Sequence, residues 1–168
     1  CGFSATRAQG SVGQIKITIL YDNTAFVPGT TANWGFSCFI QSARDTLLYD
    51  AGTYGTILLG NANTLGANLS SVKKMFLSHD HSDHAGGITT ALAQAPAVPV
   101  YVGALFSPSV IQTIVNAGGQ PVLVTGAAEV SGGHYSTGEL PSSIGTYEHS
   151  LVMDTDSGLV VVVGCSHP

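Results

Sequence analysis

The sequence is poor in charge, and above all in positive charge. Only 9% of its 168 residues are Asp, Glu, Lys or Arg; five are basic and ten acidic, and the formal net charge is −5. Because binding to a nucleic-acid backbone depends on clustered Lys and Arg, this composition argues against nucleic acid as a partner. A small-molecule substrate is the expected partner.

Paired cysteines and long apolar runs are also lacking. Three cysteines, Cys1, Cys38 and Cys165, do not make a disulfide framework. The longest apolar run, 159–163, is far shorter than the roughly 20 residues that span a bilayer. A cysteine in first position is what lipoprotein processing leaves, so membrane anchoring through Cys1 is one expectation. With the abundant small polar residues, it favours an exported, extracellular or lipid-anchored location over a cytoplasmic one.

The length suits one domain with a hydrophobic core. Residues 1–13 predict a flexible lead-in, and residues 14–168 form the domain. Hydrophobic periodicity predicts a meander of strands first and alternating helices and strands after it, which is typical of an α/β or α+β layered fold. The predicted strands are 14–21, 34–41, 46–50, 72–78, 98–102, 121–125, 150–154 and 159–164, and the predicted helices are 56–65, 87–95 and 107–117.

Polar side chains are concentrated in one short segment. Three of the six histidines, His79, His81 and His84, and two of the ten acids, Asp80 and Asp83, fall within residues 79–84. Imidazole and carboxylate are ligands for zinc, iron and manganese, so the segment predicts a metal site. The competing interpretation is a solvated polar turn whose histidines occur by chance.

The spacing suggests how the ligands divide. In an extended segment His79 and His81 project to the same side and can reach one ion. If a helix begins near Asp83, then Asp83 and His84 face another direction and can hold a second ion, about 3.5–4 Å from the first. Asp80 points away from the first pair and is expected to be solvated or to support a ligand.

Several segments resemble the metallo-β-lactamase superfamily. Within it they resemble the branch of metal-dependent hydrolases and dihydropterin-linked ribofuranosylaminobenzene phosphate synthases. The segments are 48–52, 61–66, 78–87, 136–141 and 164–168. The resemblance implies an αββα sandwich with one or two metal ions, zinc first, at one edge of the sheets. It also implies a domain longer than this chain, so the C-terminal part is expected to be missing, or to be supplied by a partner or by a second copy in a homo-oligomer.

The resemblance adds candidates near the end of the chain. It implies His167 as a further metal ligand, beside His79 and His81. Cys165 occupies the place of a metal-bridging Asp in many members, and it is either a thiolate ligand or a small buried apolar residue. His134 and His149 are expected at the surface or beside ligands rather than as ligands.

These observations favour a metal-dependent hydrolase, with zinc as the first choice and iron or manganese as alternatives. Such an enzyme uses metal-bound hydroxide on an ester, lactone or phosphoester-type substrate. Asp83 is the catalytic residue expected to orient the nucleophile, and His79, His81, Asp83, His84 and His167 are the expected ligands. The alternative is a non-enzymatic extracellular or surface-anchored scaffold that has kept the fold. Catalysis is expected only if the complete domain is present.

Overall fold

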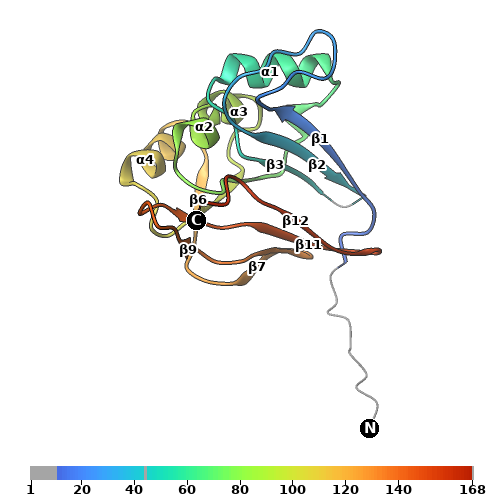
Figure 1. Cartoon of the computed structure of the whole chain (residues 1–168). Helices are drawn as coiled ribbons and strands as arrows, with labels where there is room; N and C mark the ends of the chain where they lie inside the picture. Colours follow the sequence, from blue (N-terminus) through green and yellow to red (C-terminus); the bar gives the residue numbers. More distant parts are fainter. Residues whose placement is uncertain (1–10, 44, 168) are drawn as a thin grey trace.

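The computed structural model describes residues 11–43 and 45–167 (Figure 1). Cys1 and most of the predicted lead-in lie outside the described residues, so anchoring through Cys1 stays a prediction. Within the described part of the chain, no helix is both long enough and apolar enough to cross a membrane.

A six-stranded mixed sheet forms the centre of the fold. Its order is β1-β2-β3-β4-β5-β6, with β1, β2 and β3 antiparallel and β3 to β6 parallel. The first three strands therefore form the predicted meander, and the parallel strands follow crossover connections. The strands are β1 (Ile15–Tyr21), β2 (Ser37–Ser42), β3 (Thr46–Tyr49), β4 (Lys74–Phe76), β5 (Pro99–Gly103) and β6 (Gln120–Val124).

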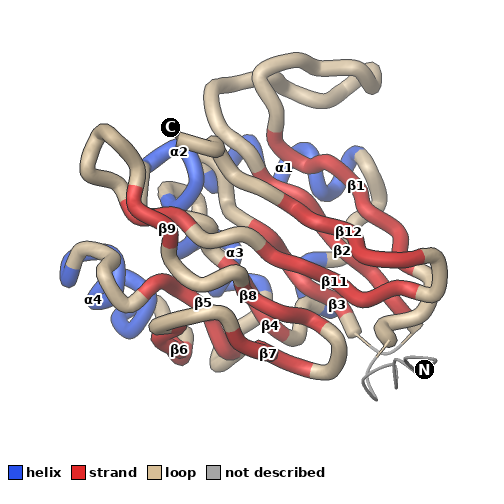
Figure 2. Tube along the Cα trace, turned by 60° about the horizontal axis from the view of Figure 1, so that its bottom comes forward, coloured by secondary structure: helices blue, strands red, loops and turns tan. Residues whose placement is uncertain are grey.

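A second, antiparallel sheet lies on one face of the first (Figure 2). It has four strands in the order β12-β11-β8-β7, and a short hairpin of β9 and β10 lies beside it. The predicted hairpin at its end is confirmed, since β11 pairs with β12 through the turn between Thr155 and Gly158. The strands are β7 (Ala128–Ser131), β8 (His134–Ser136), β9 (Leu140–Pro141), β10 (Tyr147–Glu148), β11 (Leu151–Thr155) and β12 (Gly158–Val162).

Helices cover the other face of the first sheet (Figure 1). All three predicted helices are present, and the short α2 and a 3-10 turn, η1, accompany them. The core on this side joins Leu58, Leu92 and Ile114 of the helices to Phe39, Leu48 and Met75 of the sheet. The elements are α1 (Gly55–Thr64), η1 (Leu69–Ser71), α2 (Ser82–Ala85), α3 (Ile88–Gln94) and α4 (Pro108–Asn116).

A second core fills the space between the two sheets. Ile40, Leu47 and Phe76 of the first sheet pack there against Leu151 and Met153 of β11. The central strands are therefore buried on both faces, which explains their nearly continuous apolar sequence. The described residues thus form one helical layer and two sheets of the expected sandwich.

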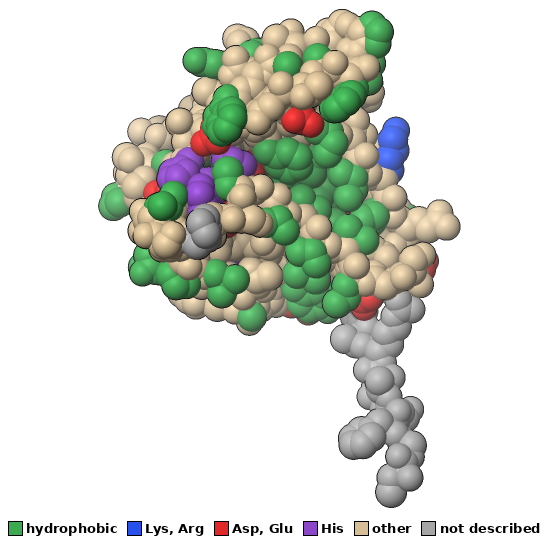
Figure 3. Space-filling model, viewed as in Figure 1, with side chains coloured by type: hydrophobic (Ala, Val, Ile, Leu, Met, Phe, Trp, Pro, Cys, Tyr) green, Lys and Arg blue, Asp and Glu red, His purple; other side chains and the backbone are tan. Residues whose placement is uncertain are grey.

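The outer face of the second sheet has no helix over it in the described part of the chain (Figure 2). Along the edge strand β12 and just beyond it, the side chains of Leu159, Val161 and Val163 are 70%, 53% and 39% exposed. Figure 3 shows hydrophobic side chains exposed on the face where β1, β2 and β12 run.

The predicted second strand begins later than expected, at Ser37 instead of Trp34. Gly35 precedes it with a φ of +131°, a conformation that interrupts a regular strand and that glycine alone adopts readily. A Cβ atom at Gly35 would lie 2.2 Å from the carbonyl oxygen of Asp83. Close backbone approach therefore fixes the β1–β2 loop against α2, and the amide of Phe36 donates to the same carbonyl at 3.2 Å.

Because of this contact, alanine at Gly35 should change the stability of the fold in the opposite direction to alanine at a glycine with free space around it. Gly35→Ala should lower the free energy of unfolding by at least about 2 kcal/mol, because it adds backbone strain and a steric overlap. Gly60→Ala should raise it by about 0.5–1 kcal/mol, since Gly60 lies in α1 and a Cβ atom added there would meet open space. Urea unfolding of both variants beside the parent chain is the measurement. Equal effects would contradict the close approach.

Candidate metal centre

The candidate ligands come together at one edge of the two sheets. β4 ends at Phe76 and is followed by His79 and His81, and α2 carries Asp83 and His84. The segment after β12 brings Cys165 and His167 from the other sheet. Figure 3 shows histidine side chains gathered at the surface here with acidic side chains beside them.

Three overlapping groups of side chains have metal-binding geometry. In each group one ligand atom per residue lies within 4.8 Å of the others. The rings of His79, His81 and His167 are mutually adjacent, with centroids 4.7, 4.8 and 5.0 Å apart. The groups are His79–His81–Asp83, His79–Cys165–His167 and Asp83–His84–Cys165.

The five predicted ligands therefore lie in one cluster. Their assignment to two separate ions differs from the expected one at Asp83. Asp83 belongs both to a group with His79 and His81 and to a group with His84. Cys165 joins the cluster as well, because its Sγ lies 3.0 Å from His84 Nε2. The alternative that Cys165 is a buried apolar residue is wrong, since its side chain is exposed.

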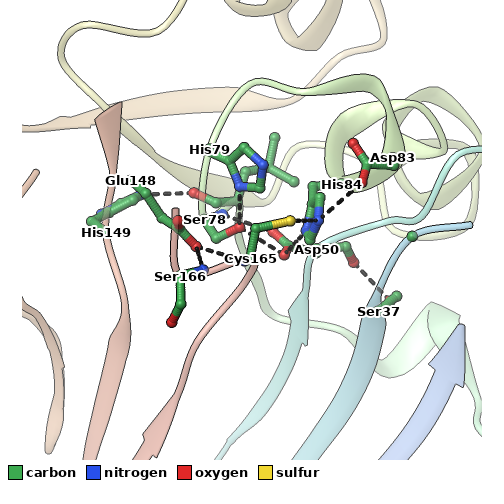
Figure 4. Close-up of polar contacts among 12 residues, drawn as sticks. Ser37, Asp50, Ser78, His79, Asp83, His84, Glu148, His149, Cys165 and Ser166 are labelled. Carbon is green, nitrogen blue, oxygen red and sulfur yellow. Dashed lines mark hydrogen bonds and ion pairs between the residues drawn. The ribbon is translucent and has the colours of Figure 1, made fainter. Parts of the chain in front are cut away.

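Asp50 organises the cluster from beneath (Figure 4). Its Oδ1 accepts the backbone amide of Ser78 at 2.7 Å, and its Oδ2 accepts the Ser78 hydroxyl at 2.8 Å and His84 Nδ1 at 2.6 Å. Burial lowers the pKa of His84, but the hydrogen bond and charge of Asp50 outweigh it, so that pKa is raised overall. Burial raises the pKa of Asp50, and its three donors oppose this effect.

The same network assigns the proton on His79. The Ser78 hydroxyl donates to Asp50, so its oxygen accepts a hydrogen bond from His79 Nδ1 at 2.9 Å. In the neutral ring, Nε2 then carries a lone pair. This atom is buried and has no hydrogen-bond partner among the described residues. Burial, and next the charge of His84, lower the pKa of His79 to about 3, which keeps the ring neutral.

Two further residues, one in β10 and one in the turn before it, orient ligands of the cluster. Thr146 Oγ1 lies 3.0 Å from His81 Nε2. The carboxylate of Glu148 accepts backbone amides of the segment that carries Cys165 and His167, and it accepts His167 Nδ1 at 3.1 Å. Burial raises the pKa of Glu148, but these hydrogen bonds outweigh it and the pKa is lowered.

The other sequence candidates lie outside the cluster. Asp80 Oδ2 accepts the backbone amide of Ser107 at 2.8 Å, just before α4, as a support rather than a ligand. His134 and His149 both lie outside the ligand groups, as expected, and both are buried, so of the two expected positions the one at the surface is wrong. His149 supports the ligand segment instead, because its Nε2 donates to the carbonyl of Leu77 at 2.7 Å.

Sequence reasoning missed Asp50, Ser78, Thr146 and Glu148 as parts of the site. The one signal present was an acid, Asp50, directly after a buried strand and before Ala51-Gly52. Its backbone has a φ of +52°, uncommon outside glycine, and such strain is found preferentially at functional sites.

Comparison with solved structures identifies the class of fold. Tm1679, a metal-dependent hydrolase of the beta-lactamase superfamily, superposes with a TM-score of 0.67 at 21% identity, over 92% of this chain and 67% of its own. The metallo-beta-lactamase fold protein YhfI from Bacillus subtilis superposes with a TM-score of 0.67 at 16% identity, over 90% and 62%. The fold is therefore that of the metallo-β-lactamase superfamily.

Sequence comparison goes one step further. The family described as Anti-Pycsar protein Apyc1 matches residues 15–103, more than half of the chain, and the chain belongs to this family. A curated relative, the 7,8-dihydropterin-6-methyl-4-(beta-D-ribofuranosyl)-aminobenzene-5'-phosphate synthase of Methanocaldococcus jannaschii, is 24% identical over 206 residues. That alignment covers 95% of this chain and 70% of the relative.

The buried His149 predicts a pH dependence of stability. Burial lowers its pKa to about 4, below the value of about 6.5 expected in the unfolded chain. Between these values the unfolded state binds the extra proton, so stability rises with pH and is lost as the pH falls from 6.5 towards 4. The full contribution is about 3 kcal/mol. His149→Gln should flatten this part of the profile, measured by urea unfolding of metal-free protein from pH 4 to 7. Parallel profiles for the two proteins would contradict the assignment.

Proposed function

We propose that the protein is a metal-dependent hydrolase of small molecules with an ester, lactone or phosphoester bond. The observation that carries this proposal is the Nε2 atom of His79. It is buried, unprotonated and without a partner in the described residues, and it belongs to two groups of converging ligand atoms. A buried nitrogen left unsatisfied in this way is unfavourable unless something binds it, and a cation is what the cluster suits.

The donor set fits zinc well. Imidazole, carboxylate and thiolate together are typical of zinc, while iron and manganese share the imidazole and carboxylate preference. His79, His81 and His167, whose rings are mutually adjacent, would form a first group that holds one ion, and Asp83, His84 and Cys165 would hold a second. Cys165 also lies within ligand distance of His79 and His167, so it adjoins both ions. Each imidazole of the first group has one nitrogen engaged with Ser78, Thr146 or Glu148, which leaves the other for the ion. Bound there, such an ion supplies Lewis acidity and lowers the pKa of water.

Asp83 is the residue we assign to the proton of the nucleophile. Its carboxylate is partly exposed, at 17%, and its Oδ2 lies 3.4 Å from His84 Nε2. It belongs to both halves of the cluster, so a water molecule between them lies within its reach. Asp50 and Ser78 hold His84 and His79 in place for this arrangement.

The proposal predicts that His79→Ala loses metal and activity together. Removal of this ligand should lower zinc affinity and the rate of hydrolysis by more than about 100-fold. Loss of a residue that only hydrogen-bonds to a metal ligand costs up to about 100-fold, and loss of the ligand itself should cost more. The readouts are metal content of protein from its native source and hydrolysis of p-nitrophenyl acetate, a γ-lactone and bis(p-nitrophenyl) phosphate. His134→Ala is the matched control, a buried histidine outside the cluster. Absence of stoichiometric metal from the parent protein would rule the proposal out.

One observation favours a second candidate, a metal-free thiol hydrolase. Cys165 Sγ contacts His84 Nε2 at 3.0 Å, and His84 Nδ1 contacts Asp50 Oδ2 at 2.6 Å. This is the order of nucleophile, base and orienting acid. Two features weigh against it. Burial and then nearby carboxylates raise the pKa of Cys165 to about 11, and the amides of Cys165 and Ser166 are bound to Glu148 and do not offer an oxyanion hole.

The two candidates respond oppositely to reagents. Metal-dependent hydrolysis should disappear with a strong chelator and return with zinc. A thiol hydrolase should keep its activity in chelator and lose it fully to iodoacetamide. Hydrolysis assayed after each treatment, with Cys165→Ser beside the parent chain, separates them. Chelator-resistant activity abolished by Cys165→Ser would favour the thiol.

A further inference from the structure

The segment that carries Cys165 and His167 has no regular secondary structure. It follows β12 directly, and Ser166 within it has a φ of +56°. Two candidate ligands, Cys165 and His167, therefore depend on a short irregular stretch of backbone. Something outside the segment has to fix its conformation if both ligands are to meet the histidines of the other sheet.

The carboxylate of Glu148 does this with both of its oxygens. Oε1 accepts the amides of Cys165 at 2.7 Å and Ser166 at 3.1 Å. Oε2 accepts both the amide and the ring Nδ1 of His167 at 3.1 Å. Three successive amides thus converge on one anion, an arrangement that binds negative charge well. Figure 4 shows Glu148 beside Ser166.

The packing around this carboxylate is tight. Glu148 is 8% exposed. A Cβ atom at Gly164 would lie 2.8 Å from its Oε1 and 2.3 Å from the hydroxyl oxygen of Ser78. Gly164 therefore lets the segment pass between Glu148 and the Ser78 that orients His79. The residue next to Glu148 is attached to the same place, because the amide of His149 donates to the Ser78 carbonyl at 2.9 Å.

We propose that Glu148 is a positioning residue that sets the two candidate ligands Cys165 and His167, each through a different oxygen. Oε1 fixes the backbone of Cys165, and Oε2 fixes the position and tautomer of His167. With Nδ1 donating to Oε2, the lone pair of His167 is on Nε2. The inference rests on the proposed function, because it assigns Glu148 a role only if the cluster holds metal.

The two oxygens make the effect of Glu148→Gln specific. The amide oxygen of glutamine can replace Oε1 and keep the amides of Cys165 and Ser166. Its NH₂ group then takes the place of Oε2, so the backbone amide of His167 loses its acceptor. The NH₂ group donates to Nδ1 instead, which moves the ring proton to Nε2, the wrong tautomer for ligation. The half of the cluster that contains His167 should bind zinc about 10–100-fold more weakly, as when a ligand loses its supporting acceptor. The group of Asp83, His84 and Cys165, which does not contain His167, should change little.

Metal titration with a competing chromophoric chelator tests this, with cobalt(II) as the spectroscopic probe. The thiolate-to-cobalt charge-transfer band reports metal binding by Cys165, and it should persist in Glu148→Gln. The affinity for one equivalent of metal should fall in the same variant. Glu139→Gln is the matched control. It also lies beside β9, and its carboxylate accepts a single backbone amide, from Leu105, outside the cluster. It should leave both affinities unchanged.

A double-mutant cycle with His167→Ala separates positioning from a general structural role. In the His167→Ala background, Glu148→Gln should cause little further loss of metal affinity. The inference would be overturned if the two substitutions lowered metal affinity additively, or if Glu148→Gln left metal affinity unchanged. It would also be overturned if the melting temperature of Glu148→Gln fell equally with and without metal. Failure of the parent chain and Glu139→Gln to bind metal would overturn the proposed function as well, so the two failures are distinguishable.

Discussion

The buried Asp50 carboxylate is the interaction on which the arrangement of the cluster depends. It lies just past the end of β3 and holds Ser78, beyond β4, and His84, in α2. Its hydrogen bonds join three consecutive parts of the fold at the sheet edge. Because Asp50 is buried, these donors are what make its charge tolerable, and the same bonds set which nitrogen of His84 and, through Ser78, of His79 faces the cluster. Packing and chemistry are therefore set by the same three contacts.

Around this centre, the structure closes the cluster from two sheets. The first sheet supplies His79, His81, Asp83 and His84 on one continuous segment. The second sheet supplies His167 and Cys165, far along the chain, and β10 supplies the carboxylate that orders them. The sandwich is thus more than a support. Packing of Phe76 against Leu151 and Met153 between the sheets brings the two ligand segments within reach of each other.

Much of the fold could be predicted because its signals are local. Alternating apolar residues indicated the meander, glycine and proline indicated the ends of helices, and the spacing of His79, His81, Asp83 and His84 indicated a ligand segment. Supporting groups were harder to predict, since their partners are distant in sequence: Glu148 contacts residues 17 to 19 positions away, and Asp50 contacts residues 28 and 34 positions away. The burial of His149 was missed for the same reason, because a neutral histidine satisfied by Leu77 and Ser136 has no local sequence pattern.

The uncharged edge strand β12 has a consequence for how the chain behaves at high concentration. Among the described residues, no strand pairs with its outer edge, where backbone donors and acceptors lie beside aliphatic side chains, with no lysine or proline in the strand to discourage pairing. Such an edge is a template for any other strand, including that of a neighbouring molecule. A charged residue in place of Val161, on the exposed face, would oppose stacking of molecules without touching the ligand cluster at the end of the sheets.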